Sequence, residues 1–156
     1  MLSHRDKEKI HAALELTKGA TPLKESFNQE DLKIIHALAL TLYRKGDLEE
    51  AKPIFQRLVS LKPFEADYWQ GLAFCAQAEE GYEEAIKAWT AAALLRDESP
   101  LPHFHLVECY LALGKEEDGS KAYAACQKRL SEKDFALKEK LETLSAPFTV
   151  EAQKEA

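Results

Sequence analysis

The sequence repeats itself with a period of 34 residues, and this periodicity restricts the fold more than any other feature. Leucines recur at Leu38, Leu72 and Leu106, and small and aromatic residues recur in the same register. The parallel series are Ala51, Ala85 and Gly119; Phe55, Trp89 and Tyr123; and Ile35, Trp69 and His103. Repeats of this length form helical arrays in which each unit buries its apolar face against its neighbours.

Each period reads as two helices joined by a short turn. In the first period, apolar residues keep helical spacing up to Gly46, which can end a helix in the left-handed conformation. Asp47 and Glu50 predict a capping box at the start of the second helix. Ser99, a capping residue, followed by Pro100 predicts the start of the third period.

A helix–turn–helix of 34 residues with these residue types resembles the tetratricopeptide repeat. The predicted fold is all-α, a helical solenoid of three such repeats with flanking helices at both ends. The predicted repeats cover residues 32–65, 66–99 and 100–133, so the repeat domain is 32–133. Residues 1–31 form an N-terminal helical segment, with a helix at 7–18 and a loop at 19–31. The C-terminal segment is 134–156. Its capping helix is predicted over residues 132–144, so it starts two residues before the segment boundary, and a frayed tail follows from Ala146.

Three residues depart from the repeat pattern. Pro53 lies inside a predicted helix, where it removes a hydrogen bond and is expected to kink or delay that helix. Gly119 replaces a small alanine and is expected to loosen the third repeat. Glu80 occupies the position of the turn glycine, and Gly81 follows one place late.

Composition and charge limit the kinds of partner and the cellular compartment that we expect. The formal net charge of −6 gives no reason to expect a nucleic-acid or anionic-membrane partner. No apolar run approaches the ~20 residues that span a bilayer, and the charged start lacks the apolar stretch of a signal peptide. An odd number of cysteines without paired spacing suits a reducing compartment. We therefore expect a cytoplasmic protein that does not insert into membranes.

The stretch from His103 to Cys109, HFHLVEC, holds the side chains most able to bind zinc or act as nucleophile and base. The repeat register gives each a packing role instead, since His103 shares the position of Ile35 and Trp69. His103 and His105 are two apart, so a helix directs them to different faces. We predict neither a catalytic site nor a metal or cofactor. An enzyme using His105 and Cys109 stays open as the alternative.

The first helices of stacked repeats line a concave inner wall, and its positions predict a groove for an extended peptide. Several of these side chains are apolar and are expected to be partly exposed, as in binding surfaces. The polar ones, His36, Gln70 and Gln77, are expected to bond the peptide backbone. The candidate groove residues are His36, Leu40, Tyr43, Gln70, Phe74, Gln77, Leu101, Phe104, Glu108 and Leu111.

The three repeats and the element Phe104, His105, Glu108 and Cys109 resemble the class II type III secretion chaperones of Gram-negative bacteria, over about residues 32–130. The resemblance implies an all-helical chaperone of the bacterial cytoplasm that keeps hydrophobic translocator proteins soluble before secretion. It implies that the groove takes an extended segment of the Pro-x-Leu-x-x-Pro type. His36 departs from the aromatic residue common at its position.

The resemblance also implies a homodimer through the N-terminal helical region, so residues 7–18 are a candidate dimer surface. Besides the enzyme, a second alternative from another class remains. The same groove in a generic tetratricopeptide-repeat scaffold would bind an unrelated extended peptide, because this architecture serves many functions.

Overall fold

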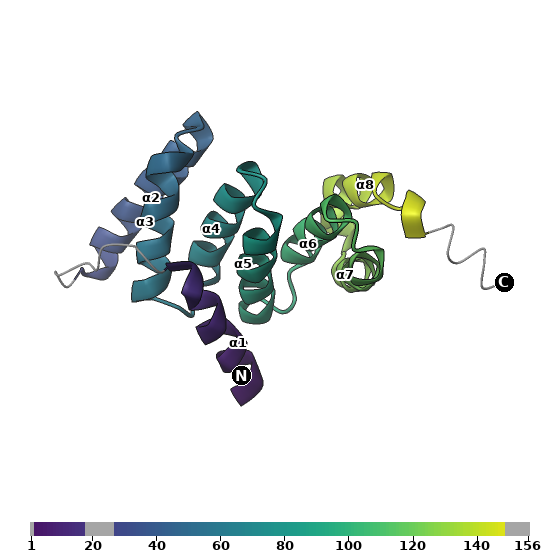
Figure 1. Cartoon of the computed structure of the whole chain (residues 1–156), viewed down its shortest axis with the longest axis horizontal. Helices are drawn as coiled ribbons and strands as arrows, with labels where there is room; N and C mark the ends of the chain where they lie inside the picture. The colour runs from purple at the N-terminus through teal and green to yellow at the C-terminus, as the bar shows by residue number, and fades with distance from the viewer. Residues whose placement is uncertain (1, 18–26, 149–156) are drawn as a thin grey trace. The chain divides into compact units, whose positions relative to one another are not determined.

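The computed structural model describes residues 2–17 and 27–148, and over these residues the chain is helical without strands. It divides into two compact units, Met1–Leu95 and Arg96–Ala156. Figure 1 shows the helices in chain order, as successive helix pairs. Three helix pairs with flanking helices at both ends confirm the predicted all-α tetratricopeptide-repeat fold class.

The first unit contains two helix pairs and the N-terminal segment. Helices α2 (Gln29–Lys45) and α3 (Leu48–Leu61) pack together, as do α4 (Ala66–Ala78) and α5 (Tyr82–Leu95), and α3 also packs against α4. Helix α1 (His4–Ala13) lies against α5, and the following 3₁₀ helix (Leu14–Thr17) lies against α3. The N-terminal segment therefore crosses the second helices of both pairs.

The second unit contains the third helix pair and the C-terminal helix. Helix α6 (Leu101–Ala112) packs against α7 (Glu116–Arg129). A 3₁₀ turn (Glu132–Asp134) leads into α8 (Phe135–Thr143), which contacts α6 and buries Leu141. The C-terminal helix predicted from residue 132 is thus present. Phe148 packs against Tyr123, with ring centroids 5.1 Å apart, so the predicted frayed tail does not begin at Ala146.

Two predicted helix starts are wrong in detail. Asp47 precedes α3, but its side chain makes no capping hydrogen bond, so the expected capping box with Glu50 is not formed. Ser99 does not cap α6, because Pro100 occupies the cap position and Pro102 lies in the first turn. Capping boxes occur instead at Ser3 with Asp6, at Asn28 with Asp31 and at Ser131 with Asp134. Asn28 ends the predicted loop at 19–31, of which residues 19–26 lie outside the described residues.

Helix α3 begins at Leu48, five residues before Pro53, so the proline does not delay it. The N-terminal helix predicted at 7–18 begins earlier, at His4, and continues as a 3₁₀ turn to Thr17. Its predicted end at Gly19 lies outside the described residues. The apolar face of this segment is used within the chain, because Ile10 and Ala13 are buried.

The three helix pairs turn with the same backbone geometry. Gly46, Glu80 and Gly114, each 34 residues apart, have positive φ values of 86°, 61° and 69°. In each turn the next amide donates to a carbonyl five residues back, from Asp47 to Leu42, Gly81 to Ala76 and Lys115 to Tyr110. This hydrogen bond is typical of helix ends with a left-handed residue. Gly46 therefore ends α2 as predicted, and Glu80 takes a conformation that favours glycine.

We expect Glu80→Gly to raise the free energy of unfolding by about 0.5–1 kcal/mol. The left-handed conformation costs a residue with a Cβ about 1–2 kcal/mol, and part of this is offset by the entropy of glycine in the unfolded chain. Urea unfolding followed by far-UV circular dichroism measures the change. Gly46→Ala is the matched control. No atom within 4 Å would obstruct the added methyl group, so the variant should be destabilised by the positive φ alone. Equal stability of Glu80→Gly and wild type would contradict this account.

Candidate functional site

Six of the ten predicted groove residues lie on α2 and α4 of the first unit, and all six are half-buried. They are His36, Leu40 and Tyr43 on α2, and Gln70, Phe74 and Gln77 on α4. Helices α2 and α4 contact each other directly. The first unit therefore brings these two rows of side chains to neighbouring helices, with part of each side chain accessible.

The six side chains on α2 and α4 form one surface. The rings of Tyr43 and Phe74 lie at one end of it, which we call the aromatic end. Their ring centroids are 5.7 Å apart. The edge contact of Phe74 with the fully buried Trp89, at 4.8 Å, holds the Phe74 ring from behind. The Trp89 indole N–H donates to Oε1 of Gln77 at 2.9 Å. This oxygen of Gln77 is therefore occupied within the chain, whereas we expected Gln77 to bond a peptide.

His36 lies in a pocket of about 320 Å³, which we call the His36 pocket, at the opposite end of the row. The His36 ring makes edge contacts with Tyr68 at 5.1 Å and Phe55 at 6.0 Å. Burial lowers the pKa of His36, and the charge of Asp67 opposes this effect. The pocket is lined by residues of polar or charged type with one exception, Leu32; they are Gln29, Leu32, Lys33, His36, Lys62, Glu65, Asp67 and Tyr68.

The remaining four predicted residues lie on α6 in the second unit. Leu101, Glu108 and Leu111 are half-buried. Phe104 is only 5% exposed, whereas we expected part of its ring to be accessible. Its ring packs edge-on against His105 at 5.1 Å. Phe104 therefore contributes mainly to the core of α6.

The stretch from His103 to Cys109 is built for packing. The Nδ1 atom of His105 lies 2.6 Å from Oε1 of Glu108, so this imidazole faces a carboxylate rather than a thiol. Cys109 is fully buried, and burial raises its pKa to about 12. A thiol with such a pKa stays protonated and is a poor nucleophile. Among residues 2–17 and 27–148, no three His, Cys, Asp or Glu side chains are grouped to hold a metal ion.

The other two cysteines are equally inert. Cys75 and Cys126 are fully buried, and burial raises the pKa of each to about 11. The Cys126 thiol donates to the carbonyl of Pro100 at 3.4 Å. All three cysteines are reduced and fill small positions between helices, which agrees with the packing roles expected from the repeat register.

His103 occupies a repeating core position, but one nitrogen atom of its ring makes no hydrogen bond there. Its buried Nε2 has no hydrogen-bond partner in the described part of the chain. Burial, and then the charge of Arg129, lower its pKa below the usual 6.5, although Asp97 opposes the shift. The Arg129 guanidinium donates to the Asp97 carboxylate at 3.2 Å.

We expect acid to destabilise the fold through His103. The unfolded chain binds this proton at a higher pH than the folded chain, so stability rises with pH between the two pKa values. The contribution is complete above about pH 6.5 and is lost as the pH falls through the lowered value. Thermal unfolding should therefore show a lower Tm at about pH 5 than at about pH 7. His103→Phe should reduce this dependence, because the variant has no imidazole to protonate at this position. An identical pH dependence in His103→Phe and wild type would contradict the assignment.

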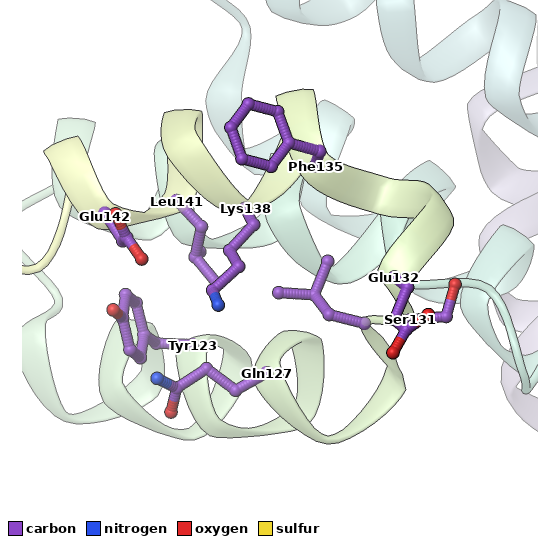
Figure 2. Close-up of a pocket in the computed structure, with 9 residues that line it drawn as sticks. Tyr123, Gln127, Ser131, Glu132, Phe135, Lys138, Leu141 and Glu142 are labelled. Carbon is purple, nitrogen blue, oxygen red and sulfur yellow. The ribbon is translucent and has the colours of Figure 1, made fainter.

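A second pocket, which the sequence did not predict, lies between α7 and α8 and has a volume of about 610 Å³. Figure 2 shows Tyr123 and Gln127 on one side, facing Lys138, Leu141 and Glu142 on the other. Phe135, also in its lining, is 67% exposed. The sequence of residues 132–144 indicated a helix, but it could not reveal how that helix would sit on α7.

None of the helices in the described ranges is long and apolar enough to cross a membrane. The tetratricopeptide-repeat family model matches residues 32–65. Low calcium response locus protein H of Yersinia pestis is 26% identical over 115 residues, which are 74% of this chain and 68% of that protein. PcrH of Pseudomonas aeruginosa, solved with the chaperone binding region of PopD, has a TM-score of 0.77 at 26% identity. That match covers 83% of this chain and 99% of PcrH. The chain is similar in sequence and in fold to the class II type III secretion chaperones.

The similarity extends to SycD of Yersinia enterocolitica, a type III secretion chaperone solved with a peptide of the translocator YopD. This chain and SycD share 25% identity and a TM-score of 0.74 over 85% of this chain and all of SycD. The resemblance identified from the sequence is thereby confirmed. The similar proteins are chaperones, a class without catalytic activity. Self-association through residues 7–18 stays a prediction.

Proposed function

We propose that this chain is a chaperone that binds hydrophobic type III secretion translocators through an extended segment and keeps them soluble before secretion. The observation that carries the proposal is the match to PcrH, at 26% identity over 83% of the chain, in a structure that includes the chaperone binding region of PopD. A translocator must later enter a membrane, so its apolar surface has to be covered in water until then.

The first unit offers suitable chemistry for such a segment. Leu40, Tyr43 and Phe74 are half-buried, so each keeps apolar surface that a bound side chain can cover. The rings of Tyr43 and Phe74 contact each other and are backed by Trp89, which fixes the surface before binding. A fixed surface loses little side-chain entropy when a peptide docks. The bound segment itself becomes ordered, which keeps affinity moderate and release easy.

The remaining predicted site residues belong to the same proposal. Gln70, Leu101 and Leu111 are half-buried positions that would contact the segment, and Glu108 would act through its pair with His105. The proposed role requires no catalysis and no cofactor, and it places the chain in the bacterial cytoplasm with its client. A buried, protonated Cys109 beside a His105 that faces Glu108 supports a binding role over an enzymatic one.

Phe74→Ala is expected to weaken binding of a Pro-x-Leu-x-x-Pro peptide by at least about tenfold. The ring supplies apolar contact area at the centre of the aromatic end, and such anchors typically contribute more than about 1.4 kcal/mol. Isothermal titration calorimetry measures the affinity, and circular dichroism verifies that the variant is folded. Phe135→Ala removes an exposed ring outside the groove and is the matched control. Folded wild type that binds no such peptide would favour the generic repeat scaffold instead.

A further inference from the structure

The His36 pocket differs in chemistry from the aromatic end of the same surface. Seven of its eight lining residues are polar or charged, and Leu32 is the exception. A pocket of about 320 Å³ has room for one side chain of a bound segment. The two ends of the surface in the first unit are therefore suited to different side chains.

The charges around this pocket are balanced. Lys33 and Lys62 contribute two ammonium groups, and Glu65 and Asp67 contribute two carboxylates. Lys33 also pairs with Glu30 on its own helix, at 3.2 Å. Because both signs line the pocket, an acidic or a basic side chain entering it would meet a like charge as well as an opposite one.

The His36 ring adds a hydrogen-bonding group that carries no charge near neutral pH, because burial lowers its pKa. A neutral imidazole has one nitrogen that donates and one that accepts. Tyr68, whose ring lies 5.1 Å from that of His36, adds a hydroxyl that can also donate and accept. An apolar side chain placed here would remove water from these groups without replacing its hydrogen bonds.

We propose that the His36 pocket selects clients that carry an uncharged hydrogen-bonding side chain, an amide or a hydroxyl, beside the apolar residue that docks at the aromatic end. This inference rests on the proposed function and specifies which segment the groove accepts. The seven-residue step from His36 to Tyr43 measures about 10 Å along α2. A segment that runs along the helix covers this distance in about three residues.

A substitution scan of synthetic peptides tests the proposal. The probes carry the core Pro-Ala-Leu-Ala-Ala-Pro, and every position except the leucine is replaced in turn by Asn, Thr, Leu, Asp or Lys. Fluorescence anisotropy at neutral pH gives each affinity. At one position, we expect the Asn or Thr peptide to bind the wild-type chain at least about tenfold more tightly than the Leu, Asp or Lys peptide.

Two variants connect this preference to the pocket. His36→Phe keeps a ring against Phe55 and Tyr68 but removes both nitrogens, so it should reverse the preference toward the Leu peptide. Tyr68→Phe removes only a hydroxyl and should weaken the preference without reversing it. His4→Phe, at an exposed histidine on α1, is the control and should keep the wild-type preference.

Failure of the proposed pocket preference and failure of the proposed function would give different binding results. Peptides that bind with no preference at any position, or with a preference that survives His36→Phe, would overturn the inference while leaving the proposed function intact. If the folded chain binds none of the peptides, the proposed function fails and the inference fails with it.

Discussion

Trp89→Ala is expected to lower the free energy of unfolding by about 3–5 kcal/mol, the usual cost of removing a large buried aromatic side chain. Trp89 is fully buried in α5. Its loss would leave a cavity, remove the edge contact that holds Phe74, and leave Oε1 of Gln77 without the indole donor. Peptide binding should fall as well, because two groove residues lose their support. Urea unfolding and calorimetric titration measure the two effects.

Trp89→Phe is the control for this prediction. It keeps an aromatic ring against Phe74 but removes the N–H donor, so it should cost less, about 1–3 kcal/mol. The variant would also retain most peptide affinity if the ring contact, rather than the hydrogen bond, positions Phe74. A loss below about 1 kcal/mol in Trp89→Ala would show that Trp89 contributes little to the core.

Gly71→Ala is expected to destabilise the chain by about 2–3 kcal/mol, although alanine is the better helix former. Gly71 is buried in α4, and a methyl group there would overlap the ring of Phe55 on α3. Phe55 is itself fully buried, so its ring has no free space to enter. The helices would have to separate, and packed interiors resist such shifts. Chemical unfolding of the variant measures the loss.

Two further variants isolate this close contact. Gly119→Ala, in α7, places its methyl group 3.4 Å from Phe148, an ordinary contact distance, so it should stabilise by up to about 1 kcal/mol. Phe55→Leu combined with Gly71→Ala should lose less than the sum of the single changes, because the smaller side chain relieves the overlap. Additive losses in the double variant would rule out the Phe55 contact as the cause.

The 34-residue period made the repeat helices predictable because packing between helix pairs demands the same residue types at the same positions. It could not distinguish positions that are equivalent in the repeat but differ in their neighbours. Leu72 is 1% exposed, whereas Leu38, its counterpart one period earlier, is 52% exposed. Leu72 lies in α4, which packs against α3 of the preceding helix pair, whereas the described residues before α2 form α1 and a 3₁₀ helix, which pack against α5 and α3.

The candidate site was predictable to a similar extent. Repeat register placed six of its residues on α2 and α4, which the structure brings into contact. Register could not show that Gln77 would be bonded to Trp89, since a hydrogen bond between α4 and α5 depends on how their side chains meet. The same limitation applies to Asp47, where the expected residue stands at the helix start but its side chain makes no cap.

The buried cysteines also make the folded chain a built-in reporter of its own motions. Cys75 lies in α4 of the first unit, while Cys109 and Cys126 lie in α6 and α7 of the second. A thiol reagent can reach each sulfur only when the surrounding helices open. Labelling rates followed by mass spectrometry would therefore time the opening of the two units separately, without any added probe.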